Sequence, residues 1–84
     1  MEIILKPQEE STNSQFDGQL VVTRNFINTF ANKAYIIAIQ AVLKIKEERV
    51  PSGADYLQVC EHNSQTFWVI DDIDHITVLM PEDY

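Results

Sequence analysis

The sequence predicts an α+β fold, with one long helix packed on a four- or five-stranded, mostly antiparallel sheet. Three observations support this prediction. The segment from Thr29 to Glu48 holds no Gly or Pro and carries apolar residues at helical spacing. Three short segments rich in β-branched and aromatic residues follow it, separated by turn residues. The 84 residues suffice for a single domain, 1–84. The expected order is strand, strand, helix, strand, strand, strand.

The N-terminal part predicts two strands joined by a polar loop. Residues 3–5 are apolar and are followed by Pro7, and residues 19–23 form a second strand candidate. The two segments can pair as a hairpin with a long connection. Residues 7–18 are polar and end in an Asp-Gly turn signal, so we expect a mobile loop whose first part is dispensable for folding.

The helix is predicted from its alanines. Four of them recur at spacings of three and four residues and therefore share one helix face: Ala31, Ala34, Ala38 and Ala41. Ile36, Ile39 and Leu43 fall on nearly the opposite side. A helix on a single sheet buries one stripe only, so the second stripe needs its own cover. That cover is either the N-terminal hairpin or a second copy, and we predict self-association as a homodimer through Ile36, Ile39 and Leu43.

The C-terminal part predicts a three-stranded antiparallel unit. Strands are expected at residues 56–61, 66–71 and 75–80, with turns at 62–65 and 72–74 and with Pro81 ending the last strand. Consecutive hairpins favour an antiparallel sheet that has the helix on one face.

The net charge of −7 is confined to the C-terminal part. Residues 50–84 hold no Lys or Arg and seven acids: Asp55, Glu61, Asp71, Asp72, Asp74, Glu82 and Asp83. Direct binding to nucleic acid or to an anionic membrane is disfavoured, because phosphate contacts need Lys and Arg. The acids are candidates for a partner-binding surface that faces a basic protein, with Trp68 and Tyr84 as aromatic anchors. The alternative is that the charge only keeps the domain soluble.

Two further constellations define a competing hypothesis, a small enzyme or metal-dependent module. Cys60 and His62 lie two residues apart and so share one strand face, as a thiolate–imidazole pair requires. Asp71, Asp72, Asp74 and His75 cluster in one turn, but their spacing differs from that of known calcium loops. The sequence shows neither an oxyanion site nor a third orienting group for the Cys60–His62 pair, so we predict no catalytic residue, no metal and no cofactor.

Three C-terminal segments carry a resemblance: 55–59 (DYLQV), 68–72 (WVIDD) and 76–84 (ITVLMPEDY). Together they resemble the end of small uncharacterised proteins carried by bacterial phages and plasmids. This resemblance implies a mobile-element origin and assigns no functional residue. Cys60 is the only cysteine and the N-terminus lacks a leader pattern, so we expect a cytoplasmic protein, in the host cytoplasm if phage-encoded.

The sequence therefore favours a small acidic, non-enzymatic protein-interaction module. In this interpretation it is a phage- or plasmid-encoded inhibitor that presents carboxylates to a basic, nucleic-acid-binding partner. The alternatives are the enzyme or metal-dependent module described above and a structural subunit of a larger assembly that works through the helix.

Overall fold

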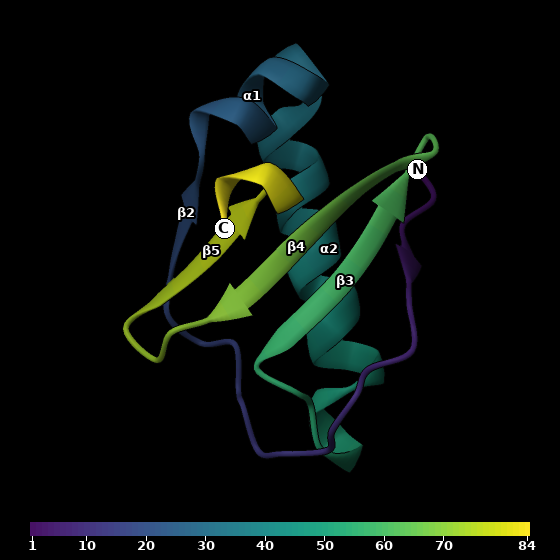
Figure 1. The fold of residues 1–84 in the computed structure, drawn as a ribbon. Helices are drawn as coiled ribbons and strands as arrows, with labels where there is room; N and C mark the ends of the chain where they lie inside the picture. The colour runs from purple at the N-terminus through teal and green to yellow at the C-terminus, as the bar shows by residue number, and fades with distance from the viewer.

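The computed structural model describes all residues 1–84 and has a five-stranded mixed sheet with its long helix on one face (Figure 1). The elements in chain order are β1 (Ile4–Leu5), β2 (Gln19–Val22), α1 (Arg24–Phe30), η1 (Ala31–Lys33), α2 (Ala34–Glu48), η2 (Val50–Ser52), β3 (Leu57–His62), β4 (Gln65–Asp71), β5 (His75–Leu79) and η3 (Pro81–Asp83). The order of strands across the sheet is β1-β3-β4-β5-β2. The predicted α+β fold is confirmed.

The sheet is built around the antiparallel unit β3-β4-β5, as the turn spacing predicts. The expected N-terminal hairpin is wrong, because β1 and β2 lie at opposite edges of the sheet. β1 pairs antiparallel with β3, and β2 pairs parallel with β5. The segment between β1 and β2 therefore has to cross from one edge to the other, past the end of α2 where η2 lies (Figure 1).

This crossing segment, expected from the sequence to be a mobile loop, makes several hydrogen bonds to the rest of the chain, and its mobility stays a prediction. Gln8 Nε2 donates to the Gly53 carbonyl at 2.9 Å, and Thr12 Oγ1 donates to the Ala54 carbonyl at 2.7 Å. Phe16 is buried in the core. Several polar residues of the segment thus bond to the backbone after η2, although most of them stay exposed to solvent.

Gln8 also belongs to a buried polar network at the start of β3. Its Oε1 accepts from Gln58 Nε2 at 2.7 Å and from the Asp55 backbone N–H at 3.0 Å. Arg49, at the end of α2, donates to Gln58 Oε1 at 2.9 Å and to the Lys6 carbonyl at 2.9 Å. Gln58 is fully buried, so these bonds satisfy an amide that would otherwise be costly to place there.

The helical region begins at Arg24, after the first of four possible N-caps among which the sequence leaves the start open: Thr23, Asn25, Asn28 and Thr29. Thr23 is the N-cap of α1, with its Oγ1 accepting from the Phe26 N–H at 3.2 Å. Ala31 has a φ of 54°, and this turn ends α1 and starts the longer α2. Ala31 is therefore exposed and does not belong to the predicted alanine stripe.

The remaining members of the stripe face the sheet, as predicted. Together with two isoleucines they make up the five buried residues of α2: Ala34, Ile37, Ala38, Ala41 and Ile45. Alanine side chains let the helix backbone approach the sheet closely. Next to this contact an aromatic cluster fills the core: the Phe26 and Phe67 rings lie 5.2 Å apart, and Phe30 lies 5.7 Å from Phe67.

The helical stretch Arg24–Ser52 is long and apolar enough to cross a membrane by length and composition alone. The core helix of a soluble domain meets the same criterion. Here the stretch is divided by η1, and the inner side of α2 packs on the sheet.

Candidate partner-binding face

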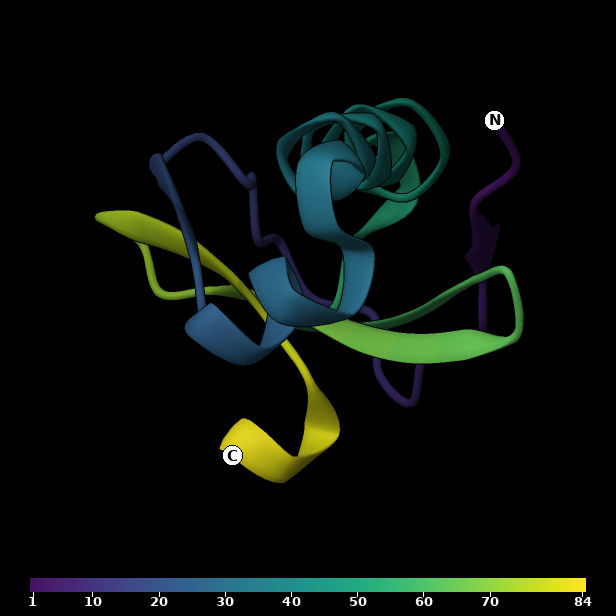
Figure 2. The ribbon, with the colours of Figure 1, turned by 90° about the horizontal axis from the view of Figure 1, so that it is seen from above.

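The sheet has one face under the helices and one face without helical cover. Side chains alternate along a strand, so Cys60, Phe67 and Val78 point to the helices and are buried. The other set forms what we call the open face: Leu57, Val59, Glu61, Thr66, Trp68, Ile70, Thr77 and Leu79. Figure 2 shows α2 on one side of the sheet and the C-terminal turn on the other. Most of the open-face residues are apolar.

Trp68 and Tyr84 meet on the open face. Their rings contact each other edge to face, with centroids 5.4 Å apart. Trp68 is half-buried, whereas Tyr84 is 77% exposed. Leu79 pairs with Trp68 across the strands and is only 5% exposed, although it lies outside the main core. The C-terminal turn η3 therefore covers one part of the open face and places an exposed aromatic ring beside Trp68.

Asp83 holds this turn in place. Its Oδ2 accepts from Thr23 Oγ1 at 2.7 Å and from the Met80 N–H at 3.0 Å, and its Oδ1 accepts from Asn25 Nδ2 at 2.6 Å. These bonds lower the pKa of the Asp83 carboxyl below its usual range, with the Thr23 hydroxyl as the largest cause. The ionised carboxylate thus fixes η3 to the start of α1.

The seven acids of residues 50–84 are not all exposed, so the predicted acidic surface cannot include every one of them. Asp55 is buried, and its Oδ2 accepts from the Glu10 N–H at 3.1 Å. Asp71 Oδ2 accepts from the Phe16 N–H at 3.1 Å, and its Oδ1 accepts from the Ile73 N–H at 3.0 Å. Together with Asp83, these carboxylates stabilise turns and loop contacts, so we leave Asp55 and Asp71 out of the candidate interface.

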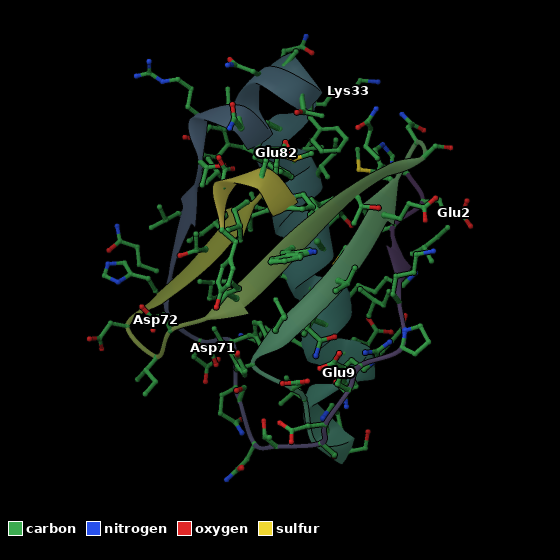
Figure 3. The ribbon with its side chains drawn as sticks, viewed as in Figure 1. Glu2, Glu9, Lys33, Asp71, Asp72 and Glu82 are labelled. Carbon is green, nitrogen blue, oxygen red and sulfur yellow. The ribbon has the colours of Figure 1, made fainter.

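The other four acids are accessible. Glu61 lies on the open face and pairs with Lys6 at 2.8 Å. Asp72, Asp74 and Glu82 are exposed and have no ion pair in the chain. Asp72 lies at the β4–β5 turn and Glu82 at the C-terminal turn (Figure 3). Free carboxylates thus stand at two separate places around the open face.

Cys60 and His62 share one strand face, as predicted, but this face is the one under the helices. Cys60 is fully buried, and burial raises the pKa of its thiol to about 12. The His62 Nδ1 lies 2.6 Å from the Glu2 carbonyl oxygen, and the ring packs near Phe30. A protonated, buried thiol is a poor nucleophile, so the geometry gives the enzyme hypothesis no support from this pair.

The acidic turn likewise lacks the geometry of a metal site. No three His, Cys, Asp or Glu side chains come together to hold an ion. A polar hollow of about 520 Å³ lies beside this turn and is lined by Thr12, Asn13, Ser14, Gln15, Asp17, Asp71 and Ile73. Asp71, one of its two carboxylates, is already engaged by the two backbone N–H groups.

The outer stripe of α2 remains uncovered within the chain. Ile36, Ile39 and Leu43 are 55%, 44% and 53% exposed. The N-terminal strands lie at the sheet edges and do not cover this stripe. Of the two covers considered from the sequence, the hairpin of the same chain is therefore wrong, and self-association stays a prediction.

No protein-family model, curated protein or solved structure matches the chain. The mobile-element origin implied by the C-terminal resemblance therefore stays a prediction.

Sequence reasoning found Trp68 and Tyr84 but missed Leu57, Val59 and Ile70 as members of the open face. The uninterrupted apolar run at residues 67–70 could have indicated this face. A strand with apolar residues at both odd and even positions has two apolar faces.

Proposed function

We propose that the chain is a non-enzymatic protein-interaction module that binds a basic partner protein on the open face. The observation that carries this proposal is the Trp68–Tyr84 pair on an apolar sheet face without helical cover. Aromatic side chains dominate binding hot spots, and apolar patches on small soluble domains mark interaction surfaces.

The charge around this face supports a basic partner. Asp72, Asp74 and Glu82 have no internal ion pair, and Glu61 is engaged by Lys6. Carboxylates around an apolar centre attract Lys and Arg side chains and speed association. A protein groove that binds nucleic acid presents Lys and Arg side chains, whose charge is complementary to these carboxylates. We therefore favour inhibition of a nucleic-acid-binding protein in the host of a phage or plasmid.

The test is capture of a host protein by the immobilised chain, read against variants at two salt concentrations. We expect capture to fall between ~50 and ~500 mM salt, because the Debye length shrinks from about 14 to about 4 Å. The Asp72→Asn, Asp74→Asn, Glu82→Gln variant should reproduce the loss at low salt. Tyr84→Ala should weaken capture at both salt concentrations, since its contribution is apolar.

Matched controls separate the open face from general effects. Glu2→Gln, Glu9→Gln, Glu10→Gln removes three exposed carboxylates elsewhere, and Tyr35→Ala removes an exposed tyrosine from α2. Both variants should capture the partner like the wild type. Capture that is equal in all variants and indifferent to salt would mean that the acids serve solubility alone and that the open face is not the interface.

A further inference from the structure

The outer side of α2 carries a second pattern, which fits a copy of itself. Five exposed residues follow one another at spacings of three, four, three and four: Lys33, Ile36, Gln40, Leu43 and Glu47. This spacing arranges side chains in one row along a helix, as at the seam of a coiled coil. Ile39 lies beside the row and is also exposed. We call these six residues the helix row.

The helix row is nearly symmetrical about Gln40. Lys33 and Glu47 lie at equal separations before and after it, and Ile36 and Leu43 lie at nearly equal ones. A two-fold axis at Gln40 therefore brings Lys33 of one copy beside Glu47 of the other, twice, and Ile36 beside Leu43. The two Gln40 amides meet at the axis, where each can donate to and accept from the other. The row is about 20 Å long at ~1.5 Å per residue.

The charges at the two ends of the row have no partner inside the chain. The three internal ion pairs are Lys6–Glu61, Lys44–Glu48 and Lys46–Asp17, so both Lys33 and Glu47 are free. In an antiparallel pair of helices these opposite charges face each other. In a parallel pair Lys33 would face Lys33, and Glu47 would face Glu47. The charge pattern therefore selects the antiparallel arrangement.

The shape of the surface agrees with helix-on-helix packing. Hollows of about 320 and about 180 Å³ flank α2, and Leu43 lines both. One lies between the helix and the N-terminal residues Met1 and Ile3, and the other lies between the helix and the segment from Phe16 to Leu20. The apolar side chains of the helix row thus lie between two hollows, into which the side chains of another helix can pack.

We propose that the chain forms an antiparallel two-fold dimer through the helix row, with Gln40 at the axis. This goes beyond the proposed function. The open face lies on the far side of the sheet from α2 (Figure 2), so the proposed dimer would display two open faces pointing away from each other. Each dimer then binds two partner molecules. The row is small beside the ~800 Å² per partner of a standard interface, so we expect dissociation in the micromolar range.

The experiment is sedimentation velocity over a concentration series from ~5 μM to ~1 mM, which brackets that affinity. The wild type should pass from monomer to dimer. Lys33→Glu and Glu47→Lys should each weaken dimerisation about tenfold, because each turns two attractive contacts into repulsive ones. The double variant K33E/E47K should recover dimerisation. Arg24→Glu, an exposed base on α1 with no ion pair, controls for the change in net charge.

Cross-linking tests the position of the axis independently. Gln40→Cys should form a disulfide-linked dimer under mild oxidation, whereas Asn63→Cys, at the exposed β3–β4 turn, should not. Circular dichroism confirms the fold of each variant. A wild type that is monomeric at ~1 mM overturns the proposal, since the row would then have no affinity for itself. A double variant as weak as either single one, or a monomer that instead binds phosphatidylcholine vesicles through Ile39 and Leu43, also overturns it.

Discussion

Gln8 connects the N-terminal crossing segment to the buried start of β3, so Gln8→Ala tests whether this segment belongs to the fold. The alanine removes the acceptor of two buried donors, Gln58 Nε2 at 2.7 Å and the Asp55 N–H at 3.0 Å. Gln58 keeps its bond to the Asp55 carbonyl, but the Asp55 N–H loses the acceptor that Gln8 provides. A net contribution of ~1 kcal/mol for each of these two bonds, with nothing counted for the partly exposed bond from Gln8 to the Gly53 carbonyl, gives about 2 kcal/mol of destabilisation.

This loss is large enough to measure by thermal unfolding. For a domain of this size ~1 kcal/mol shifts the midpoint by about 4–8 °C, so Gln8→Ala should melt about 8–16 °C below the wild type. Trp68 is the only tryptophan, and its fluorescence, together with far-ultraviolet circular dichroism, reports the transition.

Gln15→Ala is the matched control, because Gln15 is exposed and its amide bonds only to the Asn13 carbonyl. We expect its stability to stay within ~0.5 kcal/mol of the wild type. If the two variants melt together near the wild type, residues 7–15 are a mobile loop and the network at Gln8 does not stabilise the fold.

Two further predictions concern the core and one close contact. Cys60 should resist Ellman's reagent at pH 8 until the chain unfolds. Burial raises the pKa of the Cys60 thiol from 9.0 to about 12, so its contribution to stability is present below pH 9 and is lost as the pH rises toward 12. The Cys60→Ala variant should therefore lose stability less steeply than the wild type between pH 9 and 12. Urea denaturation with the same pH dependence in both proteins would contradict this. Gly18→Ala should destabilise by about 1–3 kcal/mol, because a Cβ would lie 2.7 Å from the Ile73 carbonyl oxygen; an unchanged melting temperature would show that the turn yields.

Local patterns predicted the elements of this fold better than their arrangement. The alanine spacing correctly placed Ala34, Ala38 and Ala41 on the side of the helix that faces the sheet. Residues three and four apart share one face of any α-helix, whatever the helix packs against. The start of the helical region was left open among several possible N-caps, because the choice of Thr23 depends on packing. The hairpin of β1 and β2 was wrong because a long connection leaves strand pairing to the rest of the sheet.

The candidate site was predictable only in part. Trp68 and Tyr84 stood out by residue type, but their contact depends on Asp83, which joins segments 60 residues apart in the sequence. The charge count was correct, yet it gave no sign that Asp55 and Asp71 are used inside the fold. Tertiary structure decides whether a carboxylate faces water or accepts from a backbone N–H. The sequence around an acidic turn residue is the same in both cases, so it cannot distinguish them.

Both edge strands of the sheet come from the first 22 residues of the chain, and this has a consequence for synthesis on the ribosome. β1 and β2 emerge before β3 and β5, the strands that they flank. The nascent chain therefore carries two apolar segments and an amphipathic helix with no sheet to receive them. We expect the β3-β4-β5 unit, whose contacts are local, to form first once it has emerged and the two flanking strands to join it last. Until then the apolar residues of these early segments stay exposed, which makes the nascent chain prone to aggregation.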